Sequence, residues 1–160
     1  SGFTLGVLLA LMASMNFGGS GLAGWLTDRL GDRPITVLGT ALTAVGLVLV
    51  GTAGANPTMT TVVIATAVVG LGFGIHQAAV YALTLRGAPS EHAGATSAAL
   101  TVSQTIGTVA SIALMTSLLK WQQSSNGDSF VEAYRFSYLV AAGIAVLSGV
   151  IVLRMRQSRP

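Results

Sequence analysis

The sequence is divided into five long apolar segments that contain almost no charged residues. They cover approximately residues 3–26, 35–55, 58–85, 93–119 and 134–153. The hydrocarbon core of a bilayer is about 30 Å thick, and roughly 20 helical residues cross it. The two-residue alternation typical of membrane β-strands does not extend over any useful length. We therefore expect an all-α, polytopic membrane bundle of five transmembrane helices, with the lipid bilayer as its surroundings.

The charge content argues against both a soluble domain and a nucleic-acid-binding protein. Only 8% of the residues are charged and the mean hydropathy is +0.74, whereas soluble domains have about 25% charged residues. The net charge is +3. The basic residues stand singly at the ends of apolar segments and form no stripe, so we expect no nucleic-acid partner.

The residue types needed for metal binding or catalysis are also missing from the apolar segments. The chain has no cysteine, which excludes disulfides and thiolate metal sites. Its two histidines, His76 and His92, lie on different segments rather than one helical turn apart. No segment contains a carboxylate pair. We therefore expect no enzyme, no metal site and no cofactor.

The basic residues predict how the helices are oriented across the membrane. If the connection after the first segment is cytoplasmic, six arginines fall on the inner side: Arg29, Arg33, Arg86, Arg154, Arg156 and Arg159. Only Lys120 and Arg135 then fall outside. Because cytoplasmic loops carry the excess of basic residues, the first residue is expected outside and the last one inside.

A cluster of four charges separates the first two apolar segments. Asp28, Arg29, Asp32 and Arg33 stand within six positions, which predicts a short loop at the inner membrane surface. Gly24 and Gly31 allow this loop to turn sharply. Carboxylate and guanidinium groups in one loop can bridge neighbouring helix ends in one conformation and release them in another. We therefore interpret Gly24, Asp28, Arg29, Gly31 and Arg33 as a conformational gate.

Small residues four apart predict faces on which helices pack closely. The pairs are Ser14/Gly18, Gly70/Gly74, Gly107/Ser111 and Ala145/Gly149. The segment from Gly70 to Ile75 is not a nucleotide-binding loop, since Ile75 stands where the dinucleotide fingerprint needs its third glycine. The segment also lies inside a membrane-length run.

Two stretches of the sequence resemble a known family. The spacing Gly24-x-Leu26-x-Asp28-Arg29-x-Gly31-x-Arg33 resembles the loop signature of the major facilitator superfamily, except at Asp32, where a basic residue is common. Further on come Gly70-Leu71-Gly72-Phe73-Gly74, Ala88-Pro89, Gly94-Ala95-Thr96-Ser97 and Ser103-Gln104-Thr105-Ile106-Gly107. This order is similar to that in the C-terminal half of fourteen-helix drug:proton antiporters.

The resemblance implies how the chain fits into a larger protein. It places the chain as the last five helices of the C-terminal half, with the first helix of that half and the whole N-terminal half absent. The missing N-terminal half of the same transporter would then be a partner. Substrate would bind near the membrane midplane and move by alternating access.

Polar side chains inside the apolar segments are candidates for a substrate or proton pathway. Such groups are costly in a bilayer unless they have partners, so they tend to mark function. The candidates are Asn16, His76, Gln77, Tyr81 and Gln104. Small hydrogen-bonding groups in an apolar cavity suit an uncharged or amphipathic organic substrate. No segment has an interior carboxylate, so a proton would be carried by the missing part or by His76.

These observations together favour a secondary active transporter in the bacterial inner membrane. We expect proton-coupled efflux of drugs or small organic metabolites. The alternative is a non-transporting helical subunit for anchoring or assembly. Such a subunit would need neither a switching charge cluster nor polar groups around a shared cavity.

Overall fold

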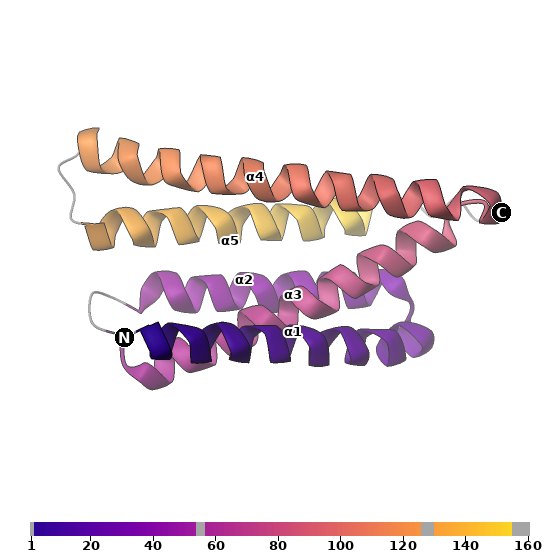
Figure 1. The fold of residues 1–160 in the computed structure, drawn as a ribbon, viewed down its shortest axis with the longest axis horizontal. Helices are drawn as coiled ribbons and strands as arrows, with labels where there is room; N and C mark the ends of the chain where they lie inside the picture. The colour runs from indigo at the N-terminus through magenta and orange to yellow at the C-terminus, as the bar shows by residue number, and fades with distance from the viewer. Residues whose placement is uncertain (1, 54–56, 126–129, 155–160) are drawn as a thin grey trace.

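The computed structural model describes residues 2–53, 57–125 and 130–154, which form five long helices (Figure 1). They are α1 (Gly2–Leu30), α2 (Asp32–Thr52), α3 (Met59–Arg86), α4 (Ala93–Ser125) and α5 (Phe130–Arg154), with a short 3₁₀ turn, η1 (Ser90–His92), before α4. Each of these helices is long and apolar enough to cross a membrane. The expected all-α membrane bundle is therefore confirmed.

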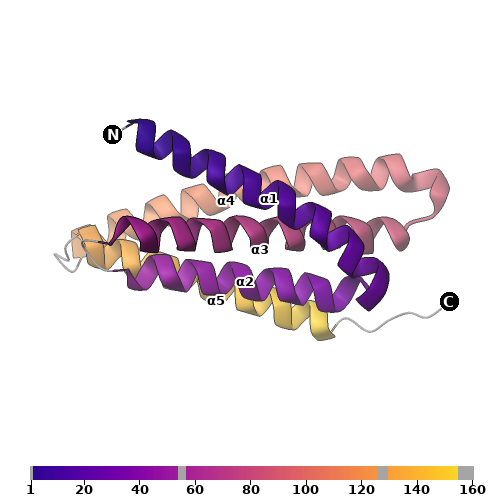
Figure 2. The same ribbon diagram turned by 90° about the horizontal axis from the view of Figure 1, so that it is seen from below.

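The helices pack in an order that differs from their order in the sequence. α3 lies against both α1 and α2, α2 against α5, and α5 against α4. Figure 1 shows α3 running obliquely, so that it approaches α4 near η1 and diverges from it toward the other end. Figure 2 shows α2 running alongside α3, while α1 crosses α3 at an angle. No residue of α4 within the apolar span Ser90–Trp121 is buried. α4 is thus the least enclosed helix of the described bundle.

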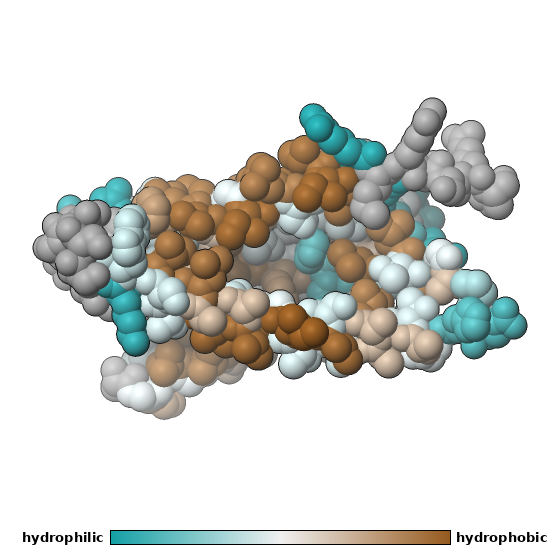
Figure 3. Space-filling view, turned by 90° about the horizontal axis from the view of Figure 1, so that it is seen from above, coloured by the Kyte–Doolittle hydropathy of each residue, from teal (hydrophilic) through white to brown (hydrophobic). Residues whose placement is uncertain are grey.

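Apolar side chains cover the outside of the bundle, while its interior is built mostly from alanine, glycine, threonine and serine, with two buried isoleucines. The central cluster consists of Ala23, Ile35, Ile75 and Ala79. Many large apolar side chains, such as Ile106, are exposed instead. Figure 3 shows hydrophobic residues over most of the middle of one face and hydrophilic residues concentrated toward its ends. This arrangement suits helices that associate in lipid, where close backbone packing replaces the hydrophobic effect.

Three glycines on α3 let its backbone approach two neighbouring helices at once. A Cβ at Gly70 would lie 2.7 Å from the Met12 carbonyl oxygen of α1, and one at Gly74 would collide with the Asn16 carbonyl oxygen. On another side of α3, a Cβ at Gly72 would lie 2.5 Å from the backbone nitrogen of Thr43 in α2. Any larger residue would push these helices apart.

The expectation of close packing at small-residue pairs is confirmed for only part of the set. Gly70/Gly74 forms the contact with α1, and a Cβ at Gly149 would lie 3.4 Å from Thr40 of α2. At Gly18 and Gly107, however, a Cβ would meet no described atom within 4 Å. No described helix packs closely against those two glycines, and spacing alone does not say which helix faces meet a neighbour.

The loop expected between the first two helices is almost entirely helical, so that expectation is wrong. α1 continues to Leu30 and α2 begins at Asp32, which leaves Gly31 as the only linking residue. Gly31 has φ +88°, a conformation that other residues adopt only with strain. Gly24 lies inside α1 and does not form the turn. Within this helical extension, Arg29 folds back with its guanidinium carbon 4.0 Å from the Trp25 ring centre.

The basic residues separate to the two ends of the bundle as expected. Arg29 and Arg86 end α1 and α3, Arg33 lies at the start of α2, and Arg154 ends α5. These helix termini share one end of the molecule in Figure 1, and we call it the charged end. Lys120 and Arg135, near the α4–α5 connection, lie toward the other end. Arg156 and Arg159 fall outside the described residues.

Candidate functional site

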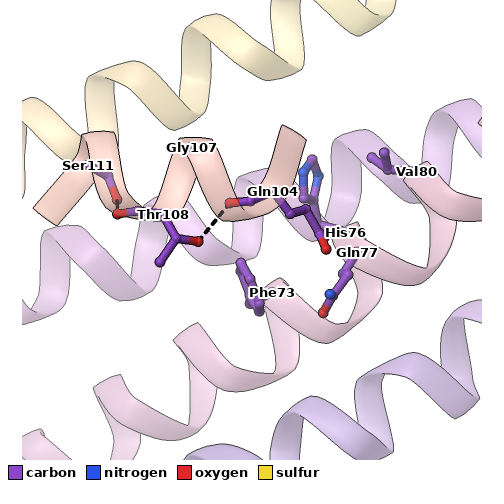
Figure 4. Close-up of a pocket in the computed structure, with 8 residues that line it drawn as sticks. All are labelled: Phe73, His76, Gln77, Val80, Gln104, Gly107, Thr108 and Ser111. Atoms are coloured by element: carbon purple, nitrogen blue, oxygen red, sulfur yellow. Dashed lines mark hydrogen bonds between the residues drawn. The ribbon is translucent and has the colours of Figure 1, made fainter. Parts of the chain in front are cut away.

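Three of the five pathway candidates line one hollow between α3 and α4, roughly midway along the bundle. His76 and Gln77 come from α3 and Gln104 from α4, and the other lining residues are Phe73, Val80, Gly107, Thr108 and Ser111 (Figure 4). The hollow has a volume of about 410 Å³, which is within the range of small-molecule sites. We call it the α3–α4 hollow.

The fourth candidate, Tyr81, supports this hollow rather than lining it. Its hydroxyl donates a hydrogen bond of 3.1 Å to Oε1 of Gln104. This bond joins α3 to α4 near the end where the two helices converge. The bond uses the amide oxygen of Gln104, and the NH₂ group of the same side chain is left as a donor for another partner. Tyr81 therefore holds the Gln104 side chain from outside the hollow.

A hydrogen-bond chain from α2 fixes the orientation of His76. The Thr40 hydroxyl donates to the Thr36 carbonyl oxygen at 2.8 Å, and Thr40 Oγ1 lies 2.9 Å from His76 Nδ1. The Thr40 hydroxyl donates its one proton to the Thr36 carbonyl oxygen, so it can only accept from His76. We therefore assign the ring proton of His76 to Nδ1. In the neutral ring, Nε2 is then left as an acceptor.

The fifth candidate, Asn16, borders a second hollow, between α1 and α3. This α1–α3 hollow is lined by Leu9, Met12, Ala13, Asn16, Phe17, Ser20 and Phe73 and has a volume of about 510 Å³. The Ser20 hydroxyl contacts carbonyl oxygens on both helices, that of Asn16 at 3.0 Å and that of Gly74 at 3.4 Å. Asn16 is therefore separated from the other candidates by one side chain, Phe73, which borders both hollows.

At the charged end, an arginine on α3 bridges two carboxylates on other helices. Arg86 Nη2 lies 3.3 Å from Oδ1 of Asp28 in α1, and Arg86 Nη1 lies 3.7 Å from Oδ2 of Asp32 in α2. The first carboxylate is mostly exposed and the second is nearly buried. Oδ1 of Asp32 and the Thr27 hydroxyl are buried without a hydrogen-bond partner among the described residues. We call Asp28, Asp32 and Arg86 the charge cluster.

The structure thus divides the gate that the sequence suggested. Asp28 belongs to the charge cluster, whereas Arg29 stacks on Trp25 and Gly24 is an ordinary helical residue. Gly31 forms the turn. Arg33 lies in the first turn of α2 and takes part in interactions of its own.

Sequence reasoning missed three residues at these sites: Asp32, Phe73 and Arg86. Asp32 was counted among the four clustered charges and noted as a departure from the family signature, but it was not assigned to the gate. Arg86 counted only toward the orientation, although its place at the end of an apolar segment puts it at the same membrane surface as Asp28. Phe73 carries no polar signal, but its position between Gly72 and Gly74 could have marked it, since these glycines pack on two faces of α3 that leave no room for a large side chain.

Comparison with known proteins gives one family and one curated relative. The sequence profile described as Major Facilitator Superfamily matches residues 1–160. A protein of Mycolicibacterium smegmatis described as a triacylglyceride transporter is 31% identical over 107 residues, which cover 61% of this chain and 19% of that protein. The chain therefore corresponds to only a small part of the length of this relative.

Proposed function

The chain belongs to the major facilitator superfamily, and we propose that it is part of a secondary active transporter that exports small uncharged or amphipathic organic molecules in exchange for protons. We place it as the last five helices of the C-terminal half, as in fourteen-helix drug:proton antiporters. The membrane is the bacterial inner membrane, with the first residue outside and the charged end in the cytoplasm. The N-terminal half of the same protein would complete the transport path.

The observation that carries this proposal is the gathering of polar side chains at one hollow in an otherwise apolar bundle. His76, Gln77 and Gln104 are far apart in the sequence, and α3 and α4 bring them to the same space. The side-chain amide of Gln77 makes no hydrogen bond to any other residue that the structure describes. Polar groups left open in this way at membrane depth suit a water-filled route or a bound substrate.

The charge cluster supports alternating access at the cytoplasmic end. Arg86, at the end of α3, forms ion pairs with the exposed Asp28 at the end of α1 and with the nearly buried Asp32 at the start of α2. Oδ1 of Asp32 is buried without a hydrogen-bond partner among the described residues, so the carboxylate is only partly satisfied in this conformation. A second conformation that supplies the missing partner would give the two states that a gate needs.

Proton coupling is proposed to use His76, a carboxylate elsewhere in the full protein, or both. The Thr40 bond leaves Nε2 of His76 as the acceptor, and the ring borders the α3–α4 hollow. An imidazole in this position can take up and release a proton within the path.

The curated relative supports the substrate class. That protein is described as a transporter of triacylglycerides, which are uncharged and largely apolar. The α1–α3 and α3–α4 hollows are lined by uncharged residue types, apart from the titratable His76. We therefore place the substrate among uncharged molecules with a large apolar part.

Flux measurements on the full-length protein test the proposal. Purified transporter in proteoliposomes should move Nile red, an uncharged lipophilic dye, at a rate that depends on an imposed pH gradient. Thr108→Trp should block this flux because the indole would fill the α3–α4 hollow. Thr116→Trp is the matched control: both hydroxyls donate to their own helix at 2.8 Å, but Thr116 lines none of the hollows described above.

The alternative anchoring subunit predicts a different result. It would give proteoliposomes whose dye flux equals that of protein-free vesicles at every pH gradient. Equal flux in the Thr108→Trp and Thr116→Trp variants would instead show that transport bypasses the α3–α4 hollow.

A further inference from the structure

We propose that Phe73 is the central substrate-contacting side chain of this chain. In this arrangement an uncharged amphiphile lies across its ring, with its polar group toward α4 and its apolar part toward α1. The proposal rests on the transport function proposed above and specifies how the substrate is held.

Phe73 stands where the hollows of the bundle meet. It lines both the α3–α4 and the α1–α3 hollows. It also lines a third, smaller hollow of about 180 Å³ against α2 and α5, together with Thr40, Thr43, His76, Ala145 and Ser148. Figure 4 shows the ring projecting from α3 beneath the Gln104–Thr108 segment of α4. A ligand in either large hollow would touch a face or an edge of this ring.

The glycines around Phe73 determine where its side chain can go. Gly70 and Gly74 press α3 against α1, and Gly72 presses it against α2. Because neither packed face has room for a large side chain, Phe73 points into the remaining space between the hollows. Its side chain stays 43% exposed. An aromatic ring held in this way offers apolar area with little loss of conformational entropy on binding.

The two hollows differ in polarity, which sets the direction of the ligand. On the α1 side, four of the seven lining residues are apolar in addition to Phe73: Leu9, Met12, Ala13 and Phe17. On the α4 side, five of the eight lining residues carry polar side chains: His76, Gln77, Gln104, Thr108 and Ser111. An amphiphile is therefore bound most favourably with its apolar part against α1 and its polar group against α4.

The hydrogen-bonding groups of the α3–α4 hollow define the polar end of the ligand. The Tyr81 hydroxyl donates to Oε1 of Gln104, so the NH₂ group is the part of the Gln104 side chain available to a ligand. The Gln77 side chain can both donate and accept. His76 Nε2 accepts, as argued above. The Thr108 and Ser111 hydroxyls donate to carbonyl oxygens of their own helix. This set fits an ester, carbonyl or hydroxyl group, as in a monoacylglycerol.

Inhibition of Nile red flux by monoacylglycerols tests the role of Phe73 in the full-length transporter. Phe73→Ala should raise the monoacylglycerol concentration needed for half-inhibition about tenfold, because the aromatic contact is lost. Phe136→Ala is the matched control, since Phe136 is 41% exposed and lines none of the described hollows. An equal shift in both variants, or no shift in either, would overturn the proposal.

A crossed comparison tests the direction of the ligand. Phe17→Ala, on the apolar side, should weaken the preference for long over short acyl chains and leave the preference for glycerol over methyl esters unchanged. Gln77→Leu, on the polar side, should do the reverse. If either variant alters both preferences equally, the polar and apolar ends are not held where the proposal puts them.

Photolabelling keeps the proposal testable even without measurable flux. A monoacylglycerol with a diazirine in its acyl chain should label α1 and α3 residues around Phe73 in membranes, and Phe73→Ala should lose that label. Absence of pH-dependent flux together with labelling at Phe73 would reject the proposed transport function alone. Flux without labelling near Phe73 would reject this inference alone.

Discussion

Neutralising the charge cluster should reveal two ion pairs that contribute unequal free energies, although they share Arg86. The Asp28 pair is the shorter, at 3.3 Å, but its carboxylate side chain is 76% exposed. Solvent screening limits such a pair to below about 1 kcal/mol. The Asp32 pair is longer, at 3.7 Å, but the Asp32 side chain is only 11% exposed. Burial should therefore outweigh the small difference in distance.

Coulomb's law gives the size of the difference. At an effective dielectric constant of about 20, charges at the Asp32–Arg86 distance attract by about 4 kcal/mol. The cost of desolvating Asp32, together with solvent screening at the 57% exposed Arg86 side chain, offsets part of this. We expect a net coupling of about 2 kcal/mol for Asp32–Arg86, against about 0.5 kcal/mol for Asp28–Arg86.

Double-mutant cycles on Nile red flux measure both couplings. One cycle combines Asp32→Asn with Arg86→Gln, and the other combines Asp28→Asn with Arg86→Gln, each at matched membrane abundance. Because the proposed mechanism closes this end in every transport cycle, the coupling should appear in the logarithm of the rate. A coupling for Asp28 equal to or larger than that for Asp32 would refute the argument that burial decides the strength.

Three further predictions concern local packing and hydrogen bonding. Gly31→Ala should destabilise the purified protein by about 1–2 kcal/mol, because alanine resists the positive φ of the turn; Gly24→Ala, inside a helix with open space, should leave the thermal denaturation midpoint unchanged or raise it. Gly72→Ala should lower the thermal denaturation midpoint because the added methyl group forces α2 and α3 apart, whereas Gly107→Ala should leave it unchanged. Equal effects of the two substitutions would contradict the assigned packing. Thr40→Val should weaken the pH dependence of Nile red flux by leaving His76 Nδ1 without its partner, and Thr40→Ser should restore it; an unchanged pH profile in the valine variant would exclude a role for this bond.

The five helices were predictable because each apolar segment must satisfy its backbone hydrogen bonds internally in lipid. Their ends were less predictable. Asp28 and Arg29 suggested a loop, yet α1 continues through them to Leu30. A helix can extend beyond the hydrocarbon core and keep its charges at the surface. A cluster of charges therefore marks the membrane boundary rather than the end of the helix.

The candidate site was predictable residue by residue but not as an arrangement. The cost of burying polar groups pointed to His76, Gln77 and Gln104, and the structure brings them together. The same reasoning could not tell that Asn16 belongs to another hollow. That depends on which helices are neighbours, and the glycine contacts of α3 determine this. Arg86 was missed for a related reason, since a single arginine after an apolar segment gives no sign of its partners.

The accessibility of neighbouring residues on α4 tests the central claim most directly. Thr108 lines the α3–α4 hollow, whereas Ile106, two residues away, is an exposed apolar side chain that we place in lipid. Each should be replaced by cysteine in a full-length transporter free of other cysteines and treated in membranes with an impermeant maleimide. We predict that Thr108→Cys reacts, that Nile red slows this reaction, and that Ile106→Cys does not react. Equal reactivity at both positions would contradict the account of a membrane bundle with one water-accessible substrate path.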